Sequence, residues 1–200
     1  ETRPLAQSVT SSLGKIVRIT TSGQAAPGNP SFTQAGALPE LYTIGHRNPQ
    51  GLAIHPTTGE LWQSEHGPRG GDEINRIKAG ANYGWPTITY GIEYSGTKIG
   101  EGITQQTGME QPVYYWDPVV SPSGMTFYAG KRVPEWQNNL FIGSLSGMHI
   151  VRLAFKDNKV AGEERLLAGE GQRFRDITQG KDEALYAVTD QGRLYRIDKK

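Results

Sequence analysis

A short apolar–x–Arg–apolar pattern recurs along this 200-residue chain, and it constrains the fold more than any other sequence feature. The pattern occurs four times, at 16–19, 74–77, 150–153 and 194–197. Further apolar segments precede the last three copies, and turn-forming residues separate the segments. A unit repeated in this way predicts several short antiparallel strands in one sheet, with the sheet itself repeated along the chain.

Composition favours strands over helices. The chain contains 26 glycines and 12 prolines, and long runs of helix-forming residues are missing. That glycine content is well above the usual level of about 7%. Val, Ile, Tyr and Trp between turns are typical of strands. Four strands per unit, with units roughly 40–50 residues apart plus insertions, predict an all-β fold of the β-propeller type, with a β-sandwich as the alternative.

The strand count predicts two complete four-stranded blades and two partial ones. The first partial blade has its last two strands, and the final one has its first three. Because a propeller closes with about 4–8 blades, we expect this chain to cover about half of a ring. Residues 1–200 are then the C-terminal part of one propeller domain, and we expect the N-terminal half to be absent.

Charge and apolar patterning exclude several classes of function. There are 21 Lys and Arg against 20 Asp and Glu, which argues against a general nucleic-acid binder. No apolar stretch approaches the roughly 18 residues that a membrane span requires, and the N-terminal residues lack a signal-peptide pattern. The absence of cysteine excludes disulfide frameworks and thiolate zinc sites.

The unusual loops of the predicted propeller are expected to open on one face. Four arginines in these loops, Arg47, Arg69, Arg173 and Arg175, make that face basic in a chain that is nearly neutral. Guanidinium groups bind carboxylates and phosphates bidentately, so the face predicts a ligand with several anionic groups. The alternative for Arg173 and Arg175 is simple solvation at a strand edge.

The densest loop segment, 65–86, combines glycines with oxygen ligands. Gly67 allows the backbone to approach a ligand closely, and Asp72 and Glu73 supply carboxylates near Tyr83. Carboxylates and carbonyl groups favour Ca²⁺ over a transition metal. Alternatively, the two carboxylates pair only with neighbouring arginines.

Five strings give the chain a specific resemblance: GHRNPQGLA (45–53), EHGPRGGDEIN (65–75), NYGWP (82–86), SPSG (121–124) and RFRD (173–176). They resemble the glucose/sorbosone dehydrogenase family of soluble quinoproteins, especially its bacterial aldose sugar dehydrogenase branch. The resemblance implies a six-bladed propeller that uses pyrroloquinoline quinone (PQQ) and Ca²⁺. It also implies a periplasmic or secreted location, aldose sugars as substrates and an external electron acceptor.

The same resemblance assigns roles to individual residues. Arg47 and Asn48 match the pair at the reactive quinone edge, with Arg47 as the catalytic electrophile. Arg173 and Arg175 match the pair that grips the PQQ carboxylates. Gly67 and Pro68 match the carbonyl ligands of the Ca²⁺ on PQQ, and Glu73, Tyr83 and Asp72 match a second Ca²⁺ site. Three further residues are expected near the cofactor: His66, where the family often has Gln; Ser146, near the place of a PQQ-binding Lys that this chain lacks; and Tyr94, as an aromatic wall.

The implied reaction is hydride transfer from the anomeric carbon of a sugar to the quinone, which yields a lactone. The family's base is a histidine, and none of His46, His55, His66 and His149 matches its motif. We therefore expect the isolated chain to be inactive and to need an N-terminal half of the propeller. The alternatives are a Ca²⁺-dependent sugar lactonase and a non-catalytic binding propeller.

Overall fold

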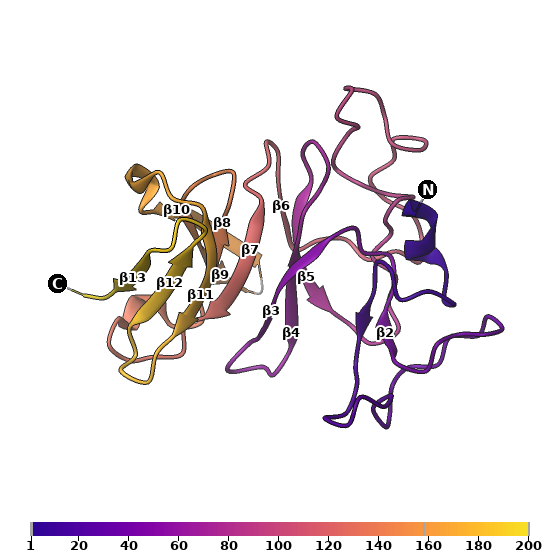
Figure 1. Cartoon of the computed structure of the whole chain (residues 1–200), viewed down its shortest axis with the longest axis horizontal. Coiled ribbons are helices and arrows are strands. Elements are labelled where there is room, and N and C mark those ends of the chain that lie inside the picture. Colours follow the sequence, from indigo (N-terminus) through magenta and orange to yellow (C-terminus); the bar gives the residue numbers. More distant parts are fainter. Residues whose placement is uncertain (1, 158, 200) are drawn as a thin grey trace.

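This computed structural model describes residues 2–157 and 159–199. They contain thirteen strands in four antiparallel sheets, joined by loops and short turns (Figure 1). The first sheet contains β1 (Ile16–Val17) and β2 (Leu41–Thr43). The second contains β3 (Pro49–Ile54), β4 (Leu61–Glu65), β5 (Asp72–Ile77) and β6 (Tyr114–Trp116). The third contains β7 (Pro122–Phe127), β8 (Leu140–Ser144), β9 (Ile150–Lys156) and β10 (Lys159–Leu166). The fourth contains β11 (Phe174–Gln179), β12 (Leu185–Thr189) and β13 (Leu194–Ile197).

Within each sheet, every strand pairs with the strand that follows it in the chain. The predicted grouping is confirmed, because two sheets of four strands lie between a sheet of two and a sheet of three. Four successive sheets also exclude the β-sandwich alternative.

The first strand of each larger sheet lies beside the first strand of the next, so β3 contacts β7 and β7 contacts β11. Glycines permit this approach. A Cβ on Gly51 of β3 would lie 2.5 Å from the Ser123 carbonyl oxygen of β7. A Cβ on Gly124 of β7 would lie 1.8 Å from Asp176 Oδ1 of β11. Side chains at these two positions would force the inner strands apart, and the spacing between sheets with them.

Two apolar layers hold the three larger sheets together. The layer between the second and third sheets contains Trp62, Ile74, Trp116, Val120, Met125, Phe127, Leu140, Ile142, Val151 and Leu153. The layer between the third and fourth contains Tyr128, Val133, Phe141, Ile150, Phe174, Ile177, Leu185 and Ala187. Both layers take alternate residues from the facing strands, which is the burial pattern that the sequence period of two predicts.

Three of the four repeated arginines form ion pairs within the sheet scaffold. Each contacts an acid from a neighbouring strand or from a hairpin loop of its own sheet. The pairs are Arg76 with Glu60 at 3.4 Å, Arg152 with Glu164 at 2.7 Å and Arg196 with Asp182 at 2.9 Å. Arg18 differs, because its guanidinium donates to the Pro27 carbonyl oxygen at 3.1 Å.

Helical structure is confined to short 3₁₀ turns in the described ranges: η1 (Arg3–Gln7), η2 (Pro134–Trp136) and η3 (Ala168–Glu170). None of these has the length and apolar character that would let it cross a membrane. The long insertion 87–111 is held by isolated bridges, one of which joins Arg69 to Ile92.

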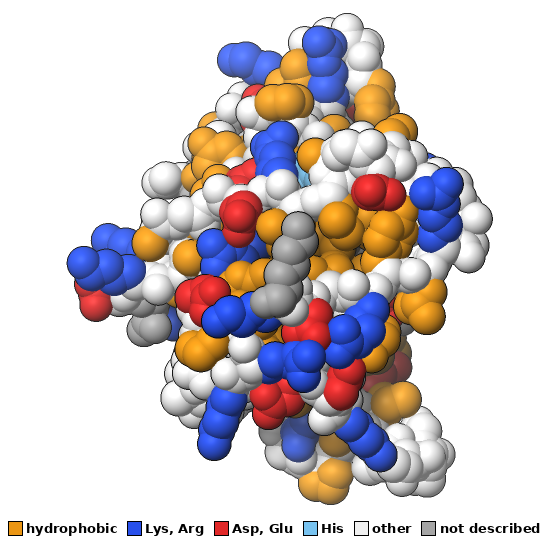
Figure 2. All heavy atoms as spheres, turned by 90° about the vertical axis from the view of Figure 1, so that its left-hand side faces the viewer, with side chains coloured by type: hydrophobic (Ala, Val, Ile, Leu, Met, Phe, Trp, Pro, Cys, Tyr) orange, Lys and Arg blue, Asp and Glu red, His pale blue; other side chains and the backbone are white. Residues whose placement is uncertain are grey.

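Charges of both signs alternate on the side of the molecule that carries the fourth sheet (Figure 2). Arg132 pairs there with Asp198, and Arg193 lies 3.8 Å from Glu170. The positive charge on this side is therefore balanced locally, in keeping with the net charge of +1 for the chain.

Candidate functional site

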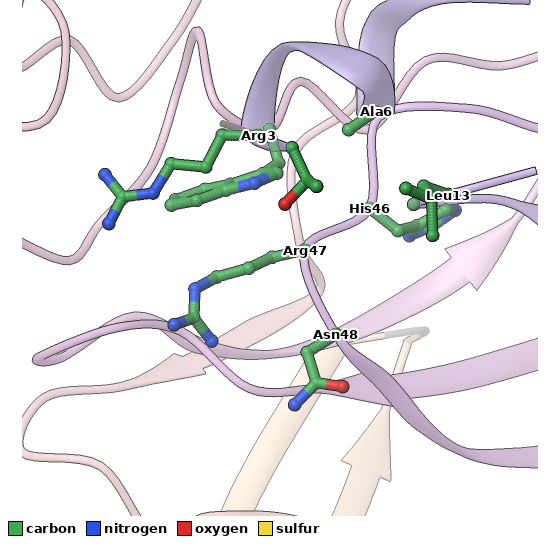
Figure 3. Close-up of a pocket in the computed structure, with 9 residues that line it drawn as sticks. Arg3, Ala6, Leu13, His46, Arg47 and Asn48 are labelled. Carbon is green, nitrogen blue, oxygen red and sulfur yellow. The ribbon is translucent and has the colours of Figure 1, made fainter. Parts of the chain in front are cut away.

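The loop between β2 and β3 carries two of the predicted site residues into an open cavity of about 320 Å³. Arg47 and Asn48 project from this loop on one side, whereas the His46 ring lies on the other side, beside Leu13 (Figure 3). Arg3 of η1 forms part of the opposite wall. Neighbouring side chains of this loop thus point to opposite sides. His46 is buried, and Arg47 and Asn48 are accessible to a ligand.

A buried hydrogen-bonded pair, His46 and Glu65, anchors this loop. His46 is fully buried, and its Nδ1 lies 3.0 Å from Glu65 Oε1 while its Nε2 lies 2.9 Å from Thr43 Oγ1. Glu65 Oε2 accepts the backbone N–H of Arg47 at 2.7 Å and that of Asn48 at 3.4 Å. Burial by itself would raise the pKa of Glu65, but His46 and these two amides outweigh it and lower the pKa. An ionised Glu65 therefore fixes the backbone from which both cavity residues project.

The Arg47 guanidinium has three neighbours that fix its direction. Nη1 donates to the His66 carbonyl oxygen at 3.0 Å, and Nη2 makes a long 3.5 Å contact with the Tyr94 hydroxyl. Its Cζ lies 5.3 Å from the centroid of the buried Trp85 ring. A cation over an aromatic face is stabilised by the ring quadrupole, and here that preference adds to the hydrogen bonds.

His66 joins this loop to the next sheet. Its Nε2 lies 2.7 Å from the Pro122 carbonyl oxygen, so Nε2 carries the proton and donates. Its Nδ1 then accepts from Asn48 Nδ2 at 3.4 Å. Burial lowers the pKa of His66, Asp72 opposes this, and the charges of Arg47 and Arg175 add to the lowering. His66 is a neutral linker at pH 7, and the site brings it within the field of arginines from two different sheets.

The two arginines at the start of β11 share one carboxylate. Arg173 Nε donates to Asp190 Oδ2 at 2.9 Å, and Arg175 Nε donates to Asp190 Oδ1 at 2.8 Å. Phe174 between them is fully buried, so both guanidinium groups emerge on the same side. The pairing of β11 with β12 shifts between Phe174 and Asp176, which places Arg175 at a β-bulge. Bulges commonly re-aim a side chain beside a functional site. Both arginines are partly exposed, and in addition to solvent they share the Asp190 carboxylate.

Asp72 is a structural cross-link in this structure. Its Oδ1 accepts the Gly67 N–H at 2.8 Å, and its Oδ2 accepts the N–H groups of Val120 at 2.8 Å and Ser121 at 2.6 Å. The carboxylate thereby ties the 65–71 loop to the start of the third sheet. Because three amides already satisfy Asp72, we leave it out of the proposed metal ligands. The predicted pairing with Arg69 or Arg76 is also replaced by these amides.

Glu73 faces Glu65 across a very small internal cavity of about 10 Å³ that Gly67 and Tyr83 also line. Burial raises the pKa of Glu73 to about 8, with a further contribution from Glu65. Asn75 Nδ2 donates to both carboxylates, while no residue of the described ranges donates to its buried Oδ1. A carboxylate such as Glu73 and a carboxamide oxygen without a donor are hard ligands of the kind that Ca²⁺ takes.

The Tyr83 hydroxyl is committed elsewhere, because it donates to the Arg76 carbonyl oxygen at 2.6 Å and accepts the Lys78 N–H at 2.9 Å. Only the backbone of Tyr83 is therefore left for a cation. Residues 2–157 and 159–199 contain no group of three or more His, Cys, Asp and Glu arranged to hold a metal. The oxygens of Glu65 already accept hydrogen bonds from His46, Asn75 and the Arg47 amide, so only Glu73 and the Asn75 side-chain oxygen are left as hard donors. Backbone carbonyl groups would have to complete the shell of a calcium ion here.

The remaining predicted residues lie in loops that contact Arg47, His66 or their neighbours. Ser146 Oγ lies 2.7 Å from Ser121 Oγ, next to the residue whose carbonyl oxygen binds His66. Tyr94 is 70% exposed and stands over Arg47. The loop of Gly67 and Pro68 is folded so tightly that a Cβ on Gly67 would lie 2.2 Å from the Gly70 carbonyl oxygen. Such a loop presents backbone rather than side chains to a ligand.

Sequence reasoning missed three residues of this site: Glu65, Trp85 and Asp190. Glu65 ends a predicted strand next to His66, so a buried acid beside a histidine was a visible signal. Asp190 follows the apolar segment 185–188 at a turn-forming Asp-Gln-Gly sequence, so an acid in a loop next to the arginine-bearing segment was a visible signal for an ion pair. Trp85 carried no such signal, because only the fold brings it to Arg47.

Comparison with known proteins identifies the family. The sequence matches the family described as Glucose / Sorbosone dehydrogenase over residues 1–196. The chain belongs to this family. Among proteins of the glucose/sorbosone dehydrogenase family, it is 44% identical to the aldose sugar dehydrogenase YliI of Escherichia coli K12 over 98% of its length, which is 53% of that relative. It is 30% identical to quinoprotein glucose dehydrogenase B of Acinetobacter calcoaceticus over 89% of the chain and 48% of that relative.

Solved structures of glucose/sorbosone dehydrogenases share the fold. A glucose dehydrogenase is 46% identical, with a TM-score of 0.93 over 99% of this chain and 58% of that one. The apo-form of the soluble aldose sugar dehydrogenase of Escherichia coli is 43% identical, with a TM-score of 0.90 over 97% of this chain and 56% of that one. The PQQ-bound aldose sugar dehydrogenase of Streptomyces coelicolor is 34% identical, with a TM-score of 0.72 over 99% and 52%. The chain therefore spans about half the length of the relatives it matches.

Proposed function

We propose that this chain is the cofactor-binding part of a PQQ-dependent aldose sugar dehydrogenase. The observation that carries the proposal is the convergence of basic and polar groups from the second and fourth sheets. Arg47 and Asn48 precede β3, His66 follows β4, and Arg175 lies in β11, yet hydrogen bonds and charge link them around one opening. A flat anionic cofactor needs such a ring of donors, because one loop cannot reach both of its ends.

The residues at this opening fit a tricarboxylic quinone. Arg173 and Arg175 already bind the carboxylate of Asp190, which supports the proposal that this pair also binds carboxylates of the cofactor. Arg47 and Asn48 supply N–H donors for the quinone edge. Tyr94 is positioned to cover one flat face. Ser146 and His66 complete the wall on the side of the third sheet.

When bound, PQQ supplies the hydride acceptor for the anomeric carbon of the sugar. The role proposed for this chain is to bind the cofactor and to polarise its quinone oxygen. The Arg47 guanidinium, held by the His66 carbonyl oxygen and Trp85, supplies a fixed positive charge where negative charge develops on an oxygen. Gly67 and Pro68 would hold a Ca²⁺ through their carbonyl oxygens beside the cofactor. Glu73, the Asn75 side-chain oxygen and backbone carbonyl groups near Tyr83 would hold a second Ca²⁺ within the protein.

The base that removes the sugar hydroxyl proton is proposed to lie outside this chain. His46 and His149 are buried, and both nitrogens of His66 face partners. His55 Nδ1 accepts backbone N–H groups of its own turn. We further propose the six-bladed ring, an external electron acceptor and a periplasmic or secreted location on the family resemblance.

The test is reconstitution with PQQ and Ca²⁺. The protein at its natural length is expected to oxidise aldoses to lactones with an artificial electron acceptor. The 200-residue chain is expected to bind PQQ without turnover. Aldose oxidation that needs no PQQ would overturn the proposal. Ca²⁺-dependent hydrolysis of sugar lactones, without oxidation, would establish the lactonase alternative.

A further inference from the structure

Asp190, at the β12–β13 turn, is the only carboxylate in the described ranges that contacts both Arg173 and Arg175. Its two oxygens accept three hydrogen bonds: one from Arg173 Nε at 2.9 Å, and two from Arg175, Nε at 2.8 Å and Nη2 at 3.0 Å. The contact is therefore made through the inner Nε edge of each guanidinium. Both Nη groups of Arg173 and Nη1 of Arg175 keep their N–H groups for a ligand.

The backbone places Asp190 at this position independently of the ion pairs. Its own N–H donates to the Arg173 carbonyl oxygen at 3.0 Å, and the Arg173 N–H donates to Gln191 Oε1 at 3.2 Å. The turn is thereby bonded to the strand that carries the arginines. The bulge at Arg175 brings its Nε within reach of the same carboxylate. Two side chains that would repel each other in isolation are thus held side by side.

We propose that Asp190 is a positioning residue that orients Arg173 and Arg175 so that their outer N–H groups bind the carboxylates of an anionic ligand. This inference rests on the proposed function, in which that ligand is PQQ. Two guanidinium groups and one carboxylate leave a net charge of +1, so the group of three still attracts an anion. A ligand that meets pre-oriented side chains does not have to order them, and the affinity is higher for that reason.

A competing role makes the opposite prediction. If Asp190 merely occupied the place of the ligand, its removal would free both arginines and tighten binding. The direction of the change in affinity on removing the Asp190 charge therefore separates orientation from competition. The low pKa of Asp190, about 2, which Arg175 and Arg173 cause, means that the carboxylate stays charged throughout such a measurement.

The experiment compares Asp190→Asn with Asp198→Asn in the protein at its natural length. Asp198 is a matched control, because it also accepts hydrogen bonds from two arginines, Arg132 and Arg196, within the same sheet region. PQQ affinity is measured by titration of tryptophan fluorescence at physiological ionic strength. We expect Asp190→Asn to weaken PQQ binding about tenfold and Asp198→Asn to leave it unchanged. Equal or tighter binding by Asp190→Asn overturns the proposal.

A second readout needs no cofactor. The Nε–H resonances of Arg173 and Arg175 are assigned by Arg→Lys variants, and their exchange with water is measured by NMR. Loss of the Asp190 charge is expected to accelerate both exchange rates at least about tenfold. Unchanged rates would overturn the orienting role. Failure of the wild-type protein to bind PQQ would overturn the proposed function and the ligand half of this inference, while the exchange rates still decide the orientation.

Discussion

The Glu65 carboxylate accepts the backbone N–H of Arg47 at 2.7 Å, so a buried side chain of β4 fixes the loop that carries the proposed catalytic guanidinium. The same carboxylate holds the buried His46. The position and the charge of Glu65 thus determine where the Arg47 backbone lies in the proposed site.

Replacing Glu65 by Ala is expected to cost about 3 kcal/mol or more of unfolding free energy. The substitution leaves His46 and the Arg47 amide without their acceptor inside the protein, which is the expensive way to break a buried pair. Urea denaturation measures this loss. Glu60→Ala removes an exposed partner of Arg76 and serves as the control, with an expected loss below about 1 kcal/mol. Similar losses for both variants would contradict the anchoring role.

Replacing both Arg173 and Arg175 by Ala is expected to weaken PQQ binding at least about 100-fold. Each charge-assisted hydrogen bond to a carboxylate contributes about 1.5–3 kcal/mol, and the double variant removes two donors. Equilibrium titration with PQQ measures the change. The exposed Arg193 of the same sheet provides the control, and Arg193→Ala is expected to bind PQQ like the wild type.

Calcium removal is expected to reveal the raised pKa of Glu73. Because the folded-state pKa of about 8 lies above the unfolded value of 4.5, this group stabilises the calcium-free protein fully below pH 4.5 and loses that effect as the pH rises toward 8. In chelator, the Tm of the wild type should fall by about 4 °C or more over this range, relative to Glu73→Gln.

At pH 8 the order of the two proteins is expected to reverse when Ca²⁺ is added. A cation that binds only the folded wild type raises its Tm by mass action, and Glu73→Gln lacks the charge to hold it. The exposed Glu101→Gln variant is the control for a general charge effect. If Ca²⁺ raised the Tm of Glu73→Gln as much as that of the wild type, the proposed internal calcium site would be wrong.

Tyr94 offers a test of the cofactor wall. The side chain is 70% exposed, so Tyr94→Ala should leave the Tm within about 1 °C of the wild type. Loss of an aromatic face against a flat ring should weaken PQQ binding roughly three- to tenfold. Tyr94→Phe keeps the face and loses only the long contact with Arg47, so it should bind PQQ nearly as well as the wild type. Equal affinity in Tyr94→Ala would remove Tyr94 from the site.

The sheets could be predicted from the sequence because each is built from consecutive segments. The repeat places β9 and its Arg152, for example, and its pairing with a neighbouring acid needs only adjacent strands. The site depends on contacts between residues far apart in the chain. The sequence marks Arg47 as a loop residue, but its stacking against Trp85 depends on how the 82–86 turn folds back. Likewise, Asp72 resembles a metal ligand until the amides of Val120 and Ser121 are known to reach it.

We expect Asp72 to couple the second and third sheets, so that neither opens locally without the other. Its carboxylate belongs to β5, and the amides of Val120 and Ser121 lead into β7, so separating the sheets strips a buried anion of its donors. The amide hydrogens of Gly67, Val120 and Ser121 should accordingly exchange with deuterium at one common rate, set by a shared opening event rather than by local fraying. The 65–71 loop at the proposed cofactor site is therefore expected to open only as often as the second and third sheets separate.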